Sequence, residues 1–231
     1  MLEKLKREVW QANLELERIG LVIQTWGNVS GINRSEGLVV IKPSGIEYKN
    51  MKLKDMVVVD LQGKVVDGNR RPSSDTATHV ELYKAFPSIG GITHTHSLYA
   101  VMFAQACMEI QCFGTTHADT FYGSIPVTRF LTKEEIETGY EKNTGKVIIE
   151  RFRKLNPVQT PGVLVAGHAP FAWGKNAAES VKNSQTLECV AQMAFGTFQL
   201  NPRIKTLPKY VSLKHFLRKH GPNAYYGQKR N

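Results

Sequence analysis

Short β-rich segments alternate with amphipathic helical segments along the whole chain, and this alternation constrains the fold more than any other feature. Apolar residues recur at three- and four-residue steps over residues 2–19, which predicts a helix closed by Gly20. We expect strands at 21–25, 38–41, 56–61, 64–66, 89–96 and 163–166, and helices at 76–86, 97–106, 134–155, 177–198 and 213–220. Neither a repeat nor a low-complexity linker divides them. The sequence therefore predicts a single α/β domain over residues 1–231, with a central mixed or antiparallel sheet flanked by helices.

Composition excludes several classes of protein. Hydrophobic residues make up 42% of the chain and charged residues 22%, which allows a packed core and argues against disorder. No apolar run approaches the roughly 18–20 residues that span a bilayer, and the first residues lack a secretory signal, so we expect no membrane partner. Cys107, Cys112 and Cys189 have no metal-type spacing, which favours a reduced, cytoplasmic location over a disulfide scaffold.

The net charge of +10 is concentrated at the C-terminus. Residues 201–231 hold eight basic residues and no acidic one, whereas the first 200 residues carry 22 basic and 20 acidic residues. Such a tail suits an anionic substrate, an acidic neighbouring subunit, nucleic acid or simple solvation. Aromatic residues are not interleaved with its cations and no nucleic-acid-binding motif is present, so we expect no nucleic-acid partner.

Two histidines, His94 and His96, stand two positions apart at the end of a predicted strand. Alternate side chains of a strand share a face, so both imidazoles can bind one metal ion. His168 follows a short predicted strand and Asp75 lies in a tight polar loop, and both can complete the site. The pair can also be accidental, with nearby hydroxyls satisfying each ring. His79 and His117 are weaker candidates, and we expect His79 to lie at a helix surface.

Small polar pairs in predicted loops indicate anion recognition. They offer backbone N–H groups and hydroxyls without bulk, as phosphate-binding loops do, and Lys42 adds a positive charge. Each pair alone is more often an ordinary turn, but together with the histidine pair they make a phosphorylated substrate plausible. The pairs are Gly27-Asn28 in the predicted turn at 26–30, Ser44-Gly45 and Ser73-Ser74.

Asp119 is flanked by apolar and aromatic residues. Burial there is expected to raise the pKa of its carboxyl group, which suits a proton carrier. A helix cap or turn is an equally good interpretation of this aspartate from the sequence alone.

Taken together, these residues resemble the L-ribulose-5-phosphate 4-epimerase family of the class II, metal-dependent aldolase superfamily. The resemblance covers nearly the whole chain. It is carried in order by residues 25–30 (TWGNVS), 41–45 (IKPSG), 72–75 (PSSD), 86–91 (FPSIGG), 94–97 (HTHS), 114–119 (GTTHAD), 171–176 (FAWGKN), and 217–220 (LRKH) with 224–228 (AYYGQ). Some relatives carry a second histidine where Ala166 stands here, and the extra residues 229–231 follow the usual end. Neither departure touches a matched motif.

The resemblance implies a role for each matched position. It implies a Zn²⁺ site (Mn²⁺ or Co²⁺ are alternatives) formed by His94, His96 and His168 with the Asp75 carboxylate. It implies a substrate and phosphate pocket of Asn28, Lys42, Ser44, Gly45, Ser73 and Ser74. It also implies proton transfer by Asp119 and Tyr226, supported by Thr115, Glu141, His215 and Arg218.

The resemblance further implies the reaction and the assembly. The enzyme would interconvert L-ribulose 5-phosphate and D-xylulose 5-phosphate by cleaving and re-forming the C3–C4 bond, in arabinose or ascorbate catabolism. It would act as a homotetramer in which the basic tail, about residues 201–231, carries Tyr226 to a neighbour's active site. The nearest alternative is a fuculose- or rhamnulose-phosphate aldolase of the same superfamily. Fuculose-type enzymes have a glutamate in the position of Asp75, which favours the epimerase. A methylthioribulose-phosphate dehydratase is a further relative.

Overall fold

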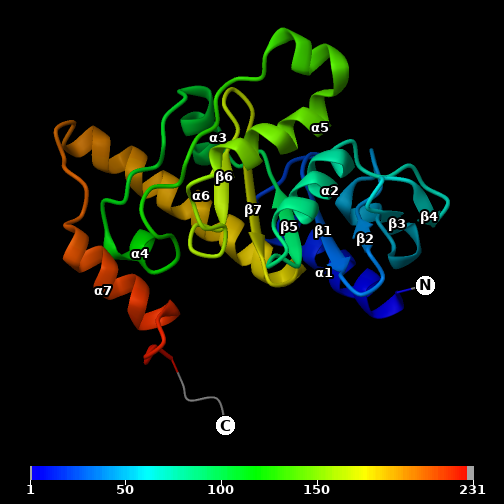
Figure 1. The fold of residues 1–231 in the computed structure, drawn as a ribbon, viewed down its shortest axis with the longest axis horizontal. Helices are drawn as coiled ribbons and strands as arrows, with labels where there is room; N and C mark the ends of the chain where they lie inside the picture. Colours follow the sequence, from blue (N-terminus) through cyan, green and yellow to red (C-terminus); the bar gives the residue numbers. More distant parts are fainter. Residues whose placement is uncertain (1, 228–231) are drawn as a thin grey trace.

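Seven strands form one antiparallel sheet in the computed structural model, which describes residues 2–227 (Figure 1). The strand order is β4-β3-β2-β1-β5-β7-β6, and every pair of neighbouring strands is antiparallel. The strands are β1 (Asn28–Asn33), β2 (Leu38–Ile41), β3 (Val57–Asp60), β4 (Val65–Asp67), β5 (Gly91–His94), β6 (Gly162–Leu164) and β7 (Pro170–Gly174). The predicted fold class, a single α/β domain with helices around a central sheet, is confirmed.

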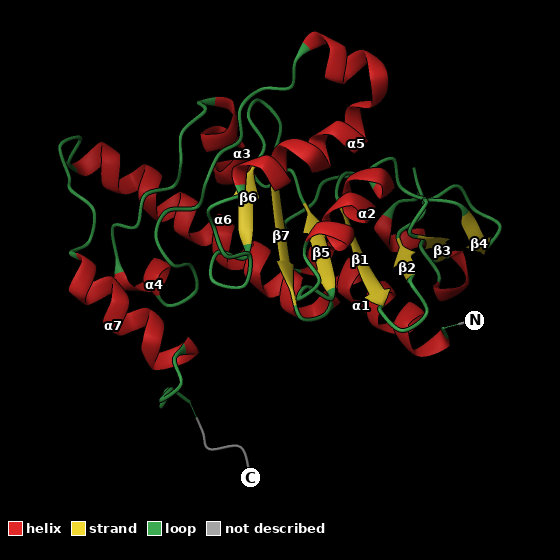
Figure 2. Ribbon diagram, viewed as in Figure 1, coloured by secondary structure: helices red, strands yellow, loops and turns green. Residues whose placement is uncertain are grey.

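Seven α-helices and two short 3₁₀ helices, Tyr48–Asn50 and Leu53–Asp55, complete the described chain. The α-helices are α1 (Glu3–Arg18), α2 (Thr76–Ala85), α3 (Leu98–Gln105), α4 (Thr115–Ala118), α5 (Lys133–Arg151), α6 (Ala177–Leu200) and α7 (Lys209–His220). Figure 2 shows the helices surrounding the sheet, with α4 and α7 at one end of the molecule. No helix among residues 2–227 is long and apolar enough to cross a membrane.

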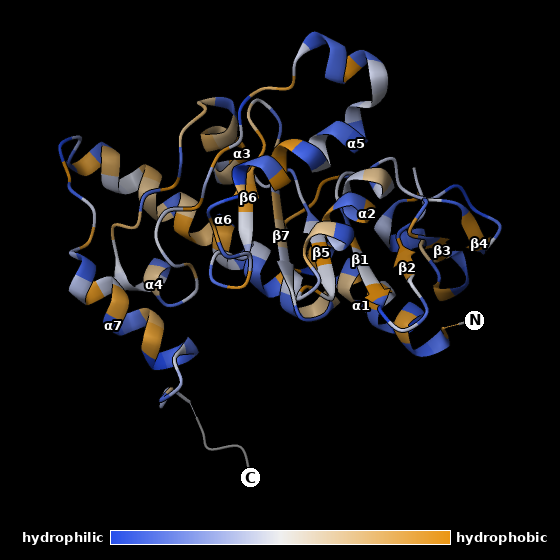
Figure 3. Ribbon diagram, in the orientation of Figure 1, coloured by the Kyte–Doolittle hydropathy of each residue, from blue (hydrophilic) through white to orange (hydrophobic). Residues whose placement is uncertain are grey.

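Alternate side chains of a strand point to opposite faces of the sheet, so the core has two layers. Val57 and Val59 of β3 pack with α2 and α5 residues, whereas Val58 between them packs with α1 residues such as Val9. A third apolar cluster joins α3 and α6 around Phe103 and Leu187. In Figure 3, apolar residues recur at intervals along the covering helices, the pattern of helices with one buried face.

A buried asparagine joins α1 to the central strand β1. The Asn13 side chain donates to the Val9 and Val29 carbonyl oxygens at 2.8 and 3.0 Å and accepts from the Val29 amide at 2.8 Å. At the other side of β1, Gly91 of β5 lies so close to the start of α6 that a Cβ atom there would be 2.3 Å from the Asn176 carbonyl carbon. These contacts fix the strands whose ends form the functional site.

Two expected local structures are wrong, and one strand was not expected. Residues 21–25 form a loop rather than a strand, because Gln24 adopts a left-handed conformation (φ 56°) that ends any extended run. The turn expected at 26–30 ends at Gly27, and β1 begins at Asn28. Strand β7 was not expected, since its terminal proline and glycine mask the alternation of Phe171 and Trp173.

Candidate metal and anion site

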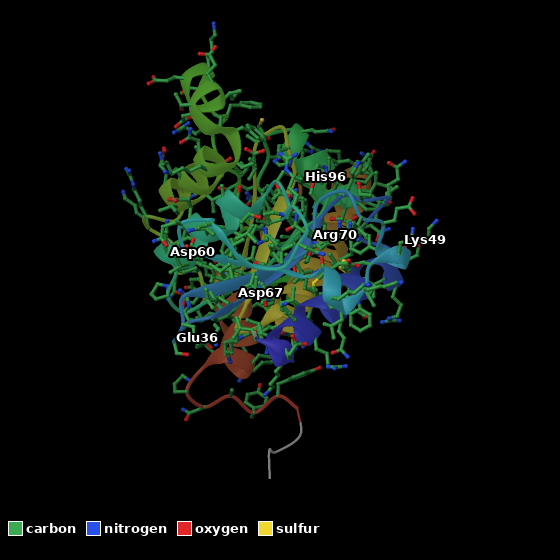
Figure 4. The ribbon with its side chains drawn as sticks, turned by 90° about the vertical axis from the view of Figure 1, so that its right-hand side faces the viewer. Glu36, Lys49, Asp60, Asp67, Arg70 and His96 are labelled. Atoms are coloured by element: carbon green, nitrogen blue, oxygen red, sulfur yellow. The ribbon has the colours of Figure 1, made fainter. Side chains whose placement is uncertain are left out.

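A cavity of about 370 Å³ opens where β1 begins and β5 ends. Asn28 and His94 are paired across the two strands at this edge. Figure 4 shows His96 at the upper right of the view and Glu36, in the connection between β1 and β2, at the lower left. The cavity collects eleven of the predicted site residues: Asn28, Lys42, Ser44, Gly45, Ser73, Ser74, Asp75, His94, His96, Glu141 and His168.

Three imidazoles converge in this cavity. His94 is the last residue of β5, His96 follows the strand, and His168 lies in the turn between β6 and β7. One ring nitrogen from each lies within 4.8 Å of those of the other two, and His94 Nε2 is 3.2 Å from His96 Nε2. Such spacing matches nitrogens that surround a single ion. The sequence prediction that these three side chains meet is confirmed.

The surroundings of the three rings suit metal ligands. His94 Nδ1 donates a hydrogen bond to the Pro170 carbonyl oxygen at 3.0 Å. The proton therefore stays on Nδ1, and Nε2 keeps a lone pair on the side of His96. Phe171 stacks on His94 with ring centroids 4.2 Å apart. Burial lowers the pKa of all three imidazoles, that of His168 to about 4, so they are neutral donors at neutral pH. These residues therefore fit a divalent metal ion.

Asp75 borders the cavity without belonging to the close cluster of ring nitrogens. Its carboxylate accepts a 2.6 Å hydrogen bond from the Asn28 amide, which also donates to Ser73 Oγ at 3.1 Å. Burial opposes ionisation of Asp75, but nearby His94 and the Asn28 hydrogen bond favour it, and its pKa is lowered. Asp75 is thus a fixed carboxylate beside the histidines, and its role as a fourth ligand stays a prediction.

Lys42 and two small polar loops line the same cavity as the histidines. Lys42 is almost fully buried, and its ammonium group donates to the Thr25 carbonyl oxygen at 3.2 Å. Burial lowers the pKa of Lys42 to about 8, with Asp75 opposing the shift. Among the hydrogen bonds of residues 2–227, the backbone N–H groups of Gly45 and Ser74 have no protein acceptor. A bound phosphate would satisfy these donors and favour the charged lysine.

Gly27 allows the loop before β1 to pack closely against His94 at the end of β5. It has φ +74°, and a Cβ atom there would lie 2.7 Å from the His94 carbonyl oxygen. Tyr48 Oη donates to the Trp26 and Gly27 carbonyl oxygens at 2.9 and 2.8 Å. Only glycine allows this close approach between the loop and the histidine strand.

Gly27→Ala is therefore expected to lower the free energy of unfolding by about 2–4 kcal/mol, from left-handed strain plus the clash with His94. Gly20→Ala is the matched control, because Gly20 has φ +71° with nothing within 4 Å of its Cβ position. It should cost only about 1–2 kcal/mol. Equilibrium denaturation measures the free energy of unfolding of both variants. If Gly27→Ala and Gly20→Ala lose the same free energy, the contact with His94 is unimportant.

A second cluster of predicted residues lies elsewhere, between α4 and α7. Asp119 accepts from Arg218 at 2.7 Å and lies 3.0 Å from His215 Nδ1, and Lys219 Nζ is 3.1 Å away. Tyr226 packs on this cluster, with Arg218 4.9 Å from its ring centroid. Thr115 begins α4 and its carbonyl oxygen accepts from the Asp119 amide. None of these residues lines the histidine cavity of the same chain.

The expected rise in the pKa of Asp119 is wrong. Burial does act to raise it, but hydrogen bonds from Arg218 and Lys219 outweigh that effect, and the pKa is lowered. Asp119 is therefore a carboxylate at neutral pH. The flanking apolar residues indicated burial, but they gave no sign that cations about 100 positions later would fold onto the aspartate.

His79 is fully buried rather than at the helix surface. Its Nδ1 lies 2.7 Å from Ser30 Oγ, which is also 2.8 Å from Tyr83 Oη. Its Nε2 and the Oδ1 atom of Asn28 are the buried side-chain polar atoms without a partner among residues 2–227. Asn28 donates its amide hydrogen to the Asp75 carboxylate, whereas the His79 backbone N–H donates to the Asp75 backbone carbonyl oxygen at 3.1 Å.

Tyr140 and Trp26 line the cavity but were not predicted to be functional residues. Tyr140 Oη lies 3.4 Å from His168 Nδ1, and the Trp26 ring lies 5.9 Å from the His96 ring. Tyr140 follows Gly139, whose φ of 146° interrupts α5. A glycine inside the helix predicted at 134–155 was the available signal that this segment has a special geometry.

Buried neutral histidines should make the protein sensitive to acid. Burial lowers the pKa of His117 to about 4 and that of His79 to about 3, against 6.5 in the unfolded chain. The unfolded state therefore binds protons first as pH falls, and stability is lost from about pH 6.5 downward. His117→Gln keeps a donor for the Gly123 carbonyl oxygen but cannot titrate. It should reduce the slope of unfolding free energy against pH between 6 and 4.5 by about 1.4 kcal/mol per unit. An unchanged slope would contradict this origin.

The structure is an α/β domain in which three histidines that could hold a metal ion line one cavity with Lys42 and small polar loops. Residues 7–195 match the family model described as the class II aldolase and adducin N-terminal domain, and the chain belongs to this family. With three histidines clustered in its cavity, the chain is an enzyme of the class II aldolase superfamily.

Solved structures show the same architecture. An L-fuculose 1-phosphate aldolase is 25% identical with a TM-score of 0.78, covering 92% of this chain and 94% of its own. An L-fuculose 1-phosphate aldolase from Glaciozyma antarctica PI12 is 18% identical with a TM-score of 0.77, covering 96% and 84%. A sugar-phosphate aldolase from Thermotoga maritima is 20% identical with a TM-score of 0.65, covering 89% and 98%. The last two similarities show the fold alone.

Proposed function

We propose that this protein is a metal-dependent L-ribulose-5-phosphate 4-epimerase that forms D-xylulose 5-phosphate. The observation that carries the proposal is the single cavity in which three neutral imidazoles face Lys42 and the unpaired N–H groups of Gly45 and Ser74. A phosphorylated sugar needs both halves of this cavity. Asp75, in place of the glutamate of fuculose-type aldolases, favours the epimerase over an aldolase. A small phosphorylated substrate and free cysteines agree with a cytoplasmic location.

The chemistry requires bond cleavage. The C4 hydrogen of the substrate is not next to the C2 ketone and is not acidic, so direct proton removal is a poor route to inversion. Cleavage of the C3–C4 bond leaves charge at C3, which is adjacent to the carbonyl, and releases glycolaldehyde phosphate. Rotation of its aldehyde group and re-formation of the bond inverts C4.

One set of residues would hold the metal ion and another would hold the phosphate. His94, His96 and His168, with Asp75, would hold a divalent metal ion such as Zn²⁺, Mn²⁺ or Co²⁺. When bound, such an ion acts as a Lewis acid for the oxygens at C2 and C3. Lys42 and the loops at 44–45 and 73–74 would hold the phosphate, so the aldehyde fragment stays in place while it turns. Asn28 orients Asp75 between the two sides, and Glu141 lines the same cavity.

Protons must be exchanged with the C4 oxygen on both faces of the aldehyde. We assign this exchange to Asp119 and Tyr226, with Thr115, His215 and Arg218 in support. Asp119 is ionised and begins as an acceptor, because its cationic neighbours lower its pKa. The cluster is absent from the cavity of its own chain, so we propose that it completes the cavity of a neighbouring subunit in a homotetramer. Its place on α7 and the basic tail suits contact between subunits.

Product analysis tests the proposal. The metal-loaded protein is incubated with L-ribulose 5-phosphate, with and without a chelator, and the products are separated. We expect chelator-sensitive D-xylulose 5-phosphate with little free glycolaldehyde phosphate. Stoichiometric free aldehyde would instead indicate an aldolase, and a dehydrated ketone would indicate a dehydratase. A loaded protein that leaves the pentulose phosphate unchanged would refute the proposal.

A further inference from the structure

We propose that the indole of Trp26 is a positioning wall of the substrate cavity, which packs against the carbon chain of the bound sugar phosphate and retains the cleaved aldehyde. This inference rests on the proposed function, because it concerns the same cavity. It names a residue whose contact decides whether the cleaved fragment is re-joined or lost.

The loop that carries Trp26 connects the two working sides of the cavity. Before Trp26, the Thr25 carbonyl oxygen accepts from the Lys42 ammonium group at 3.2 Å, on the anion side. After it, Gly27 packs against the His94 carbonyl oxygen, on the histidine side. A sugar phosphate with its phosphate at Lys42 and its ketone at the histidines must therefore pass this loop.

Hydrogen bonds hold the backbone of the loop on both sides of the Trp26 side chain. The Trp26 carbonyl oxygen accepts from Tyr48 Oη at 2.9 Å, and the Trp26 amide donates to the Ile23 carbonyl oxygen at 3.1 Å. The left-handed Gln24 sets the turn that precedes it. Fixed dihedral angles on both sides give the indole a defined starting position, and ordering it on binding costs little entropy.

The indole itself lines the cavity and is half exposed. Its exposed fraction is 50%, compared with 1% for Trp173 in the core, and its centroid is 5.9 Å from that of His96 at a tilt of 50°. A half-exposed indole in a cavity offers an apolar face against which a ligand can pack. The C–H groups between the ketone and the phosphate of a pentulose phosphate provide such a surface, and the covered ring excludes water.

Retention of the fragment follows from this contact. Cleavage breaks the C3–C4 bond, and the C4 hydroxyl proton goes to an acceptor as the C4 aldehyde forms. Both fragments must then wait together until the bond re-forms and the proton returns. A wall beside the two-carbon aldehyde allows its carbonyl to rotate while hindering its escape. Loss of the wall should therefore change the ratio of aldehyde release to epimerisation, more than it changes the rate of cleavage.

Two variants separate this role from simple packing. Trp26→Phe keeps an aromatic wall, and Trp26→Ala removes it. We expect the ratio of free glycolaldehyde phosphate to D-xylulose 5-phosphate to rise at least tenfold in Trp26→Ala and less than threefold in Trp26→Phe. Metal content and melting temperature should stay close to wild type, since the indole is exposed. Wild-type partitioning in Trp26→Ala would overturn the proposal.

Fluorescence gives a second test that does not need turnover. Trp10, Trp26 and Trp173 are the tryptophans of the chain, and of these Trp26 lines the cavity. L-Ribulose 5-phosphate should change the emission of the wild type, inorganic phosphate should change it less, and Trp26→Phe should abolish the difference. If the emission of Trp26 changes when the protein is diluted but not when L-ribulose 5-phosphate is added, Trp26 lies in a contact between subunits, and the proposal is overturned. A protein that shows the ligand response but forms no epimer would contradict the proposed reaction alone.

Discussion

His96→Ala is expected to lose bound metal and almost all turnover. His96 contributes one of three converging nitrogens, and its Nε2 is 3.2 Å from that of His94. Removing an entire ligand should weaken metal affinity by more than the roughly 10–100-fold that follows loss of a supporting hydrogen bond. His96 is only partly buried, so the variant should still fold. Metal content after dialysis, measured by atomic emission, tests the assignment.

His220→Ala is the matched control for metal content. His220 is an exposed histidine whose Nε2 contacts the Asp119 carbonyl oxygen, outside the cavity. This variant should retain wild-type metal stoichiometry. If His96→Ala also keeps full metal with normal turnover, the three imidazoles are not the metal site.

Tyr226→Phe is expected to reduce turnover by about 100-fold or more while leaving metal content and stability unchanged. The substitution removes one oxygen from a ring that is 61% exposed in the chain, so no core packing is lost. Its neighbours Arg218 and Lys219 can still lie against the phenylalanine ring, with centroid distances near the 4.9 and 4.3 Å of the tyrosine. The hydroxyl alone is tested.

Tyr225→Phe provides the comparison. Tyr225 is adjacent and equally exposed, at 64%, but its ring lies by Lys214 rather than by Arg218. Steady-state kinetics should show near wild-type turnover for this variant. If Tyr226→Phe does the same, Tyr226 takes no part in proton transfer.

The side chains of the cavity were predictable because their chemistry is local. Strand alternation predicts that His94 and His96 share a side; β5 in fact ends at His94, but the two Nε2 atoms still lie 3.2 Å apart. Short polar loops present N–H groups wherever they are folded. The structure confirms that His168 joins them, although nothing in its spacing from His94 requires this. Its prediction depended on the family resemblance and on its place after a short strand.

Long-range contacts were not predictable in the same way. The Gly27-Asn28 pair predicts a turn at 26–30, yet β1 begins at Asn28 and lies in the middle of the sheet, where Gly31 fits beneath α1 and Ser30 bonds to His79. His79 is buried between Ser30 of β1 and Phe171 of β7, contacts that its own segment does not reveal. Likewise, the cations around Asp119 come from α7, and only the folded chain reveals that they lower its pKa.

The most direct test of the central claim is the fate of the C4 hydrogen during epimerisation in D₂O. The metal-loaded protein converts L-ribulose 5-phosphate, and NMR spectroscopy measures deuterium at C4 of the D-xylulose 5-phosphate. Cleavage and re-formation of the C3–C4 bond never break the C4–H bond, so we predict that the product carries protium at C4. Deuterium at C4, or no D-xylulose 5-phosphate at all, would contradict the account.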